Sequence, residues 1–144
     1  MKLGVITDGI SRDFEHALNV MDEFELTHAE LQFVGNTEVG DHSPEEIQHI
    51  KTLADQHNIA ISCISRHNFG GLSIMDVEPE SDIFQTHLAA FRRTIDMAKA
   101  LDTNLVRIMS GSKEMILFGS HGAEVWNVSN GAWDRFLKLM EYPV

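Results

Sequence analysis

The chain has 144 residues, 43% of them hydrophobic, which suits one domain of ordinary size with a buried core, spanning 1–144. Its 22 acidic and 11 basic side chains give a formal net charge of −11, which repels nucleic acid phosphates and anionic membranes. We therefore expect neither nucleic acid nor membranes as partners. The single cysteine, Cys63, excludes an internal disulfide, and no signal-peptide pattern opens the chain, so we expect a cytoplasmic protein.

Two hydrophobic periodicities alternate along the chain. Short apolar runs that end at turn-forming residues predict strands at 3–7, 29–34, 59–64 and 105–109. Apolar residues at helical spacing predict helices that start near Phe14, at Ser43, before Leu88 and near Trp133. Strands that alternate with helices of this length imply right-handed crossovers and a parallel sheet.

Local signals sharpen three of these segments. Ser43 is placed to cap the second helix, with Pro44 at its first position and Glu46 able to complete a capping box. The long acidic stretch 65–82, which contains glycines, suggests a functional loop or lid. The apolar stripe of the last helix predicts that Trp133 packs in the core.

In a parallel α/β sheet, the loops that follow the strands gather at one edge, where ligands bind. Polar residues just after predicted strands are therefore the candidates for one site: Asp8, Asp41, His42, Arg66, His67, Ser110, Lys113 and His121. The remaining histidines within or beside predicted helices are expected to be solvated: His16, His49, His57 and His87.

The strand ends resemble a known family in their order and spacing. The segments concerned are Leu3-Gly4-Val5-Ile6, Ala29-Glu30-Leu31-Gln32, Ile61-Ser62-Cys63-Ile64-Ser65 and Leu105-Val106-Arg107-Ile108 with Gly111. In this order they are similar to the first four strands of the xylose isomerase-like superfamily, which includes sugar and sugar-phosphate isomerases and epimerases and type IV apurinic endonucleases. The resemblance implies an α/β fold, a parallel (β/α)4 unit that is half of a (β/α)8 TIM barrel.

This resemblance also implies a function and a cofactor. The expected activity is isomerisation or epimerisation of a small sugar or sugar phosphate, assisted by a divalent metal such as Mn, Mg, Zn or Co. In the family, the carboxylates and the histidine that hold this metal lie on the later strands. We therefore expect this chain to supply the substrate-lining half of a barrel, without the metal centre.

A half barrel leaves unpaired strand edges and an open inner face, which favours association with another chain. We accordingly expect a homo-oligomer, or association through the exposed barrel edges. The chain is interpreted either as a truncated product or as a half that pairs with a second copy.

Glu30 and Arg107 are charged residues inside predicted buried strands, where an unpaired charge is costly. The resemblance places an acidic residue of the second strand at the barrel mouth, in the polar network around the substrate. Glu30 is therefore interpreted as a substrate-binding residue, as a structural partner of Arg107, or as both, since the two readings are compatible.

His67 and Lys113 complete the predicted substrate-binding set. His67 follows the third strand, close to where the endonuclease branch has a metal-binding histidine, and neutral imidazole binds zinc or manganese well. A solvated loop histidine is the competing interpretation. Lys113 ends the segment 110–113, Ser-Gly-Ser-Lys, which offers backbone N–H groups and an ammonium to a sugar phosphate or forms a plain turn.

Two other functional classes remain open from the sequence. A metal-dependent apurinic endonuclease would share the fold, but the charge of −11 argues against it. A non-catalytic, flavodoxin-like module would be an open parallel sheet, and the sequence lacks the phosphate loop that such a module would be expected to show.

Overall fold

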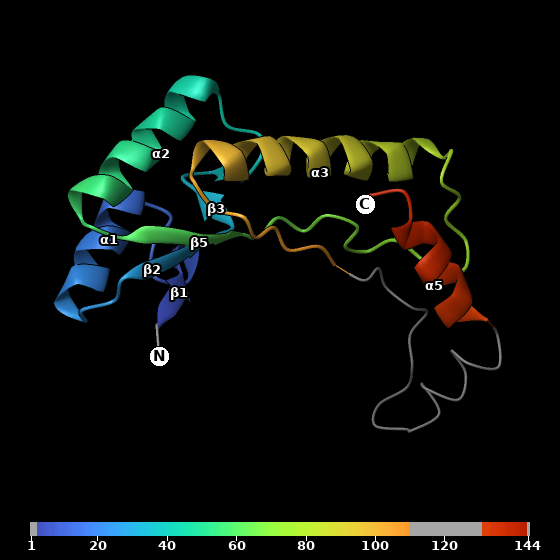
Figure 1. Ribbon diagram of the computed structural model, residues 1–144, viewed down its shortest axis with the longest axis horizontal. Coiled ribbons are helices and arrows are strands. Elements are labelled where there is room, and N and C mark those ends of the chain that lie inside the picture. Colours follow the sequence, from blue (N-terminus) through green and yellow to red (C-terminus); the bar gives the residue numbers. More distant parts are fainter. Residues whose placement is uncertain (1–2, 110–130, 144) are drawn as a thin grey trace. The chain divides into compact units, whose positions relative to one another are not determined.

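The computed structural model describes residues 3–109 and 131–143. Their elements are β1 (Gly4–Ile6), η1 (Thr7–Gly9), α1 (Phe14–Glu23), β2 (His28–Leu31), β3 (Phe33–Val34), β4 (Thr37–Glu38), α2 (Pro44–Gln56), β5 (Ala60–Ile64), α3 (Asp82–Ala100) and α5 (Ala132–Met140). Figure 1 labels all of them except η1 and β4. The chain divides into two compact units. One unit consists of Met1–His67 with Ala90–Ile108, and the other of Asn68–Ala89 with Met109–Val144.

The first unit is built on a parallel sheet with strand order β1-β2-β5. Val106 adds a parallel bridge to Ile64 at the outer edge of β5. The strands thus follow one another across the sheet in chain order, with no reversal. A doubly wound open sheet has a reversal point, whereas a barrel adds its strands in sequence, so this order favours a barrel.

Two predicted strands are shorter than the sequence suggests. The strand predicted at 29–34 leaves the sheet after Leu31, because β3 and β4 form a separate antiparallel hairpin around Gly35, whose φ is +62°. That backbone conformation suits glycine, which has no Cβ. The strand predicted at 105–109 makes only the bridge at Val106, with hydrogen bonds from Ile64 N to Leu105 O (3.0 Å) and from Arg107 N to Ile64 O (2.9 Å).

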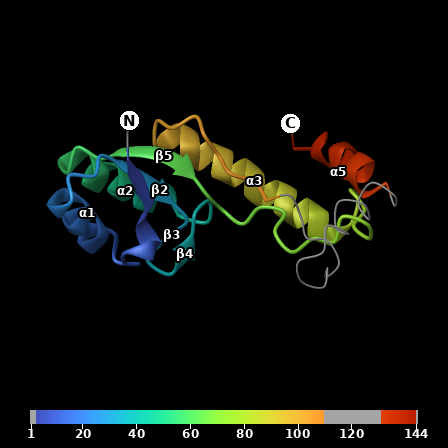
Figure 2. The ribbon, with the colours of Figure 1, turned by 90° about the horizontal axis from the view of Figure 1, so that it is seen from below.

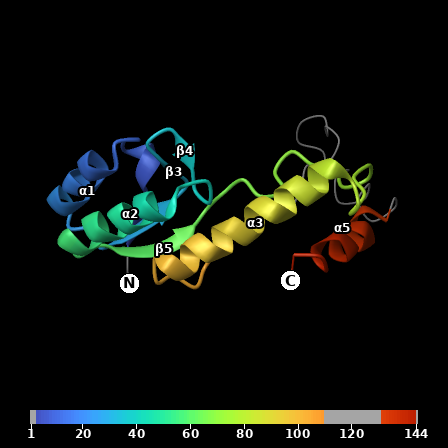
Figure 3. The same ribbon diagram turned by 90° about the horizontal axis from the view of Figure 1, so that it is seen from above.

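One face of this sheet is covered by helices, as Figures 2 and 3 show for α1 and α2. The shared core contains Leu18 and Met21 of α1, Ile50 of α2 and Met97 of α3, packed on alternate strand residues such as Leu31. Burial of this apolar surface is the main stabilising contribution to the unit. No helix within 3–109 and 131–143 has the length and apolar character needed to cross a bilayer.

The start of α2 confirms the predicted cap. The Ser43 hydroxyl accepts from Glu46 N (3.2 Å), and Ser43 N donates to the Glu46 carboxylate (2.7 Å). The hydrogen bond that Ser43 N donates to the carboxylate, and after it the Ser43 side chain, hold the pKa of the Glu46 carboxyl below its ordinary value. The capping box therefore fixes the point where the chain enters α2, directly after Asp41 and His42.

Two of the histidines predicted to be solvated are not. His57, at the end of α2, binds the Asp22 carboxylate through Nδ1 (2.6 Å) and is mostly buried. His87 stacks on Phe69 with ring centroids 5.9 Å apart and accepts from Phe69 N (3.0 Å). His16 and His49 are exposed, as predicted. Helical spacing alone does not reveal partners that come from other segments.

The second unit has a small core of its own. It contains Phe69, Leu72 and Val77 from the segment before α3, Phe84 and Leu88 from α3, and Leu139 from α5. The predicted packing of Trp133 is wrong, because this side chain is 58% exposed and Leu137 is 49% exposed. Phe136 and Met140 of the same helix line the apolar contact instead.

Candidate functional site

The sheet face opposite the helices is polar and hollow. A cavity of about 370 Å³ is lined by Gly4, Val5 and Ile6 of β1, His28 and Glu30 of β2, and Ser62 of β5. A bulge between Ala29 and Glu30 shifts the register against β5, and the Ser62 hydroxyl donates to Ala29 O (3.0 Å). A Cβ at Gly4 would lie 2.7 Å from His28 O, so the close approach of β1 and β2 requires glycine.

Glu30 and Arg107 meet on this face. Arg107 NH1 lies 3.4 Å from Glu30 Oε1, and Arg107 NH2 donates to Ser65 O (3.1 Å). The Ser65 hydroxyl also donates to Glu30 Oε1. The pairing predicted from the sequence is therefore confirmed. Both side chains remain about one-third accessible, 29% for Glu30 and 35% for Arg107, so the ion pair can still contact a ligand.

A second polar group surrounds Glu38 at the end of the β3–β4 hairpin. Its Oε1 atom accepts from His67 N and from His67 Nδ1, both at 3.0 Å. Its Oε2 atom pairs with Arg66 NH2 at 3.2 Å. Gln32 Nε2 lies 2.6 Å from His67 Nε2 and 3.2 Å from His67 Nδ1. Both nitrogens of His67 thus contact polar side chains of the first unit.

Asp41 continues the network toward α3. Its carboxylate binds Arg66 NH1 at 2.7 Å and Arg93 NH2 at 2.6 Å. Desolvation raises the pKa of Asp41, but the hydrogen bonds and charges of Arg93 and Arg66 outweigh it, so the pKa of this carboxyl lies below its ordinary value. Arg66 also donates to Val39 O (2.8 Å), which ties this arginine to the backbone after the hairpin.

Consecutive residues after β5 hold these contacts together. Ser65 binds Glu30 and the Arg107 side chain, Arg66 binds Glu38 and Asp41, and His67 binds Glu38 and Gln32. Parallel strands of adjacent β/α units place their carboxyl ends at the same edge, which explains why β2 and β5 bring these groups together.

The structure brings together only part of the predicted set. Arg66, Asp41 and His67 share one network, whereas Asp8 accepts from Phe33 N (3.3 Å) at the hairpin. His42 donates through Nε2 to Val34 O (3.3 Å). The other candidates lie outside the described residues: Ser110, Lys113 and His121.

Sequence reasoning missed Glu38, Gln32 and Arg93 as members of this network. Gln32 precedes the β3–β4 hairpin and Glu38 ends it. The sequence signalled this hairpin only as a turn at Gly35-Asn36, so the positions of both residues could not be assigned. Arg93 belongs to a helix predicted only from its apolar residues, and its spacing carries no sign that it reaches Asp41.

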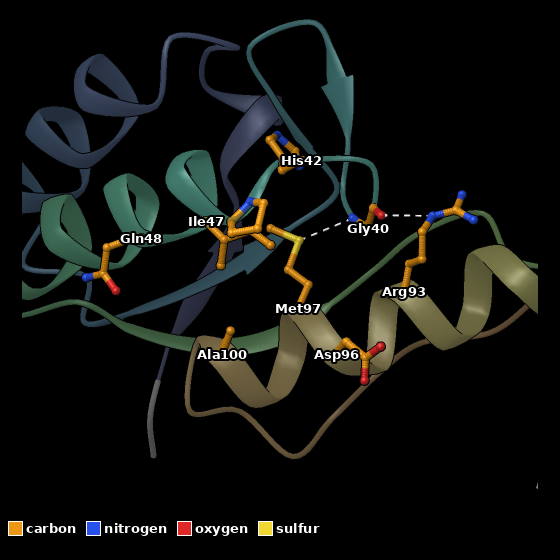
Figure 4. Close-up of a pocket in the computed structure, with 9 residues that line it drawn as sticks. Gly40, His42, Ile47, Gln48, Arg93, Asp96, Met97 and Ala100 are labelled. Carbon is orange, nitrogen blue, oxygen red and sulfur yellow. Dashed lines mark hydrogen bonds between the residues drawn. The ribbon is translucent and has the colours of Figure 1, made fainter.

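Figure 4 shows a further pocket of about 360 Å³, between α2 and α3. Ile47, Met97 and Ala100 form apolar parts of its lining. Gly40 N donates to Met97 Sδ (3.2 Å), and Arg93 Nε donates to Gly40 O (3.1 Å). These contacts hold Gly40, in the loop that precedes α2, against α3. The pocket belongs to the layer of helices, away from Glu30 and Arg107.

The described residues do not form a metal centre by themselves. Residues 3–109 and 131–143 contain no group of three or more His, Cys, Asp or Glu side chains that could hold a metal ion. His67, interpreted from the sequence either as a metal ligand or as a solvated loop histidine, contacts Glu38 through Nδ1 and Gln32 through Nε2. Ligation by His67 would therefore require displacement of Gln32 and ligands from outside the described part of the chain.

Parallel strands in chain order, helices on one face and polar groups at the strand ends define a protein of the βα-barrel class. The family model named xylose isomerase-like TIM barrel matches residues 12–142. The chain therefore belongs to the xylose isomerase-like TIM barrel family, and the predicted fold class is confirmed. Neither the curated proteins nor the solved structures provide a significant match.

Proposed function

We propose that this chain forms the substrate-lining part of a sugar or sugar-phosphate isomerase or epimerase. One observation carries the proposal: Glu30, which pairs with Arg107, lines an open hollow on the face of the sheet that the helices leave uncovered. Membership of the family supports a function of the sugar isomerase, epimerase or endonuclease type. The charge of −11 favours the sugar branch over the DNA branch.

The chemistry of the hollow suits a polyhydroxylated ligand. Glu30 supplies a carboxylate acceptor, and Arg107 supplies guanidinium donors that suit a sugar hydroxyl or a phosphate. His28 and Ser62 add further polar groups to the lining. Since Glu30 and Arg107 hold one another, each is oriented before a ligand arrives, and this preorganisation lowers the cost of binding.

A divalent metal, Mn, Mg, Zn or Co, would supply the polarisation of the sugar carbonyl in this proposal. The described residues do not fit a complete metal site, so its ligands would come from outside them. The role that we assign to this chain does not pass through the metal. Glu30, Arg107 and His67 would bind and orient the sugar, and Lys113 is proposed to contact a phosphate group.

Titration calorimetry with D-xylose, D-fructose and their phosphates tests this role. We expect binding by the chain, and at least about tenfold weaker binding in Glu30→Gln, because a charge-assisted hydrogen bond contributes about 1.5–3 kcal/mol. Glu45→Gln is the matched control, since Glu45 is exposed in the first turn of α2.

Two results would contradict the proposal. One is equal affinity of the unmodified chain and Glu30→Gln for every sugar. The other is binding of a DNA duplex with an abasic site in preference to the sugars, which would favour the endonuclease branch. Turnover should be assayed in parallel with each metal, to separate binding from catalysis.

A further inference from the structure

His67 is held by contacts that determine where its ring proton lies. His67 N and His67 Nδ1 both donate to Glu38 Oε1, at 3.0 Å. Arg66 NH2 pairs with the other carboxylate oxygen, Oε2, at 3.2 Å. The Glu38 side chain is only 20% exposed, whereas that of His67 is 50% exposed. The carboxylate is therefore fixed, while the imidazole remains accessible to a ligand.

The hydrogen-bonding capacity of these groups restricts the tautomer. An ionised carboxylate only accepts, so the His67 nitrogen that faces Glu38 must carry a proton. In the neutral ring, Nε2 is then an acceptor with a lone pair. The Gln32 amide nitrogen lies 2.6 Å from Nε2 and 3.2 Å from Nδ1, so it contacts both ring nitrogens, and the Glu38 carboxylate alone decides the tautomer, with the proton on Nδ1.

We infer that Glu38 is a positioning residue that fixes His67 as the Nδ1–H tautomer, and that His67 Nε2 with the Gln32 amide forms a subsite for a ligand hydroxyl. A hydroxyl donates and accepts through one atom, so it can enter this contact. It would donate to His67 Nε2 and accept from Gln32 Nε2. An ionised phosphate oxygen or a carbonyl oxygen lacks the proton for the first bond.

The tautomer part of this inference stands on the contacts alone, whereas the identity of the ligand rests on the proposed function. A sugar or polyol carries many hydroxyls, and one of them would replace the direct Gln32–His67 bond. Phe33 lies beside the imidazole, with ring centroids 6.3 Å apart, and closes one side of the subsite with an apolar surface.

Nitrogen-15 NMR of the histidine rings tests the positioning role, recorded on the full chain at about pH 8, where histidines are generally neutral. A His67→Asn variant assigns the signals. We expect a protonated Nδ1 and an unprotonated Nε2 at His67. In Glu38→Leu, no acceptor faces Nδ1, so the preference for the Nδ1–H tautomer should be lost.

Controls separate this role from general structural damage. Glu45→Gln, at an exposed position on α2, should leave the His67 signals unchanged. Gln32→Leu should keep the Nδ1–H tautomer, because Glu38 remains. An Nε2–H tautomer in the unmodified chain would overturn the inference. So would loss of the Nδ1–H tautomer in Gln32→Leu but not in a folded Glu38→Leu.

Titration with D-xylose and with the polyol xylitol tests the hydroxyl subsite by the same signals. We expect the His67 Nε2 signal to shift and Gln32→Leu to weaken binding about two- to tenfold, the effect expected for one neutral hydrogen bond. Gln56→Leu, at an exposed position of α2, should bind as the unmodified chain does. Binding that leaves the Nε2 signal unmoved overturns the subsite. Equal sugar affinity of the unmodified chain and Glu30→Gln contradicts the proposed function and leaves the tautomer result intact.

Discussion

The two units of this chain use their charged residues in different ways. In the first unit, charged side chains on the strands and in the segments after them bind one another, as in the Glu30–Arg107 pair. In the second unit, Arg135 of α5 binds backbone carbonyls, donating to Ile74 O (2.7 Å) and Val77 O (2.6 Å), and pairs with Glu78 at 2.9 Å. Arginine in the second unit thus supports an irregular segment, whereas arginine in the first forms part of an accessible polar surface.

This difference has a physical origin. A regular sheet satisfies its own backbone groups, so side chains at its edge are available to a ligand. The segment before α3 has little regular backbone hydrogen bonding of this kind, so its carbonyl groups need donors from other residues. The predicted lid at 65–82 is in fact packed from Asn68 onward, with Phe69, Leu72 and Val77 buried. We therefore regard the strand ends, and not this segment, as the candidate site.

The largest effect should come from the core of the second unit. Phe84 is 1% exposed and contacts Phe69 with ring centroids 5.4 Å apart. Phe84→Ala should lower the free energy of unfolding of this unit by about 3–5 kcal/mol, because it removes buried surface and leaves a cavity. Phe24→Ala, at a residue that is 70% exposed, should change it by less than about 0.5 kcal/mol. Equal effects in chemical denaturation would show that the packed core is absent.

The arginine contacts offer a smaller but more specific comparison. Arg135→Met should cost about 1–3 kcal/mol, since the carbonyls of Ile74 and Val77 lose their charged donor. Arg92→Met, at an exposed position of α3, serves as the control in the same denaturation experiment. Sugar affinity should not change in Arg135→Met. A loss of sugar affinity without a loss of stability would reverse the roles assigned to the two units.

Glu30→Gln should show the opposite pattern. The loss of stability should be about 1 kcal/mol, because Glu30 and Arg107 are both partly solvated and water replaces part of the lost interaction. The loss of ligand-binding free energy should exceed this loss of stability. Asp96→Asn, at a carboxylate that is 78% exposed, is the control. A large loss of stability with unchanged ligand affinity would make Glu30 a purely structural residue.

The smallest effect concerns acid sensitivity at Asp41. The pKa of this carboxyl is lowered in the folded protein from an ordinary value of 3.8. Its contribution to stability is thus fully present above 3.8 and is lost as the pH falls through the lowered pKa. The stability difference between the unmodified chain and Asp41→Asn should shrink over this acidic range. A difference that grows as the pH falls would contradict the assigned sign, and Asp96→Asn controls for the loss of one negative charge.

The sequence predicts those features that depend on local signals. The alternation of strands and helices, the capping box at Ser43 and the pairing of Glu30 with Arg107 all follow from spacing or from the cost of a buried charge. The hairpin after β2 was not predicted, because its two-residue strands carry too little periodicity. Trp133 was misplaced because a helical stripe gives the apolar face but not the extent to which another segment covers it.

The site was predicted only in part for a similar reason. His67 and Arg66 follow a strong strand and could be assigned to the carboxyl edge of the sheet. Glu38 and Gln32 depend on the course of the hairpin, and Arg93 depends on the rotation of α3. Such contacts are set by packing between segments distant in sequence, and no local propensity encodes them.

The central claim is that the strand ends of β2 and β5 form a sugar-binding surface. Backbone amide NMR of the full chain during titration with D-fructose and D-fructose phosphate tests it most directly. We predict that the largest shift changes fall at residues 4–6, 28–32, 62–67 and 105–107. Changes confined to 42–48 and 93–100, around the pocket between α2 and α3, would contradict the claim, as would the absence of any change.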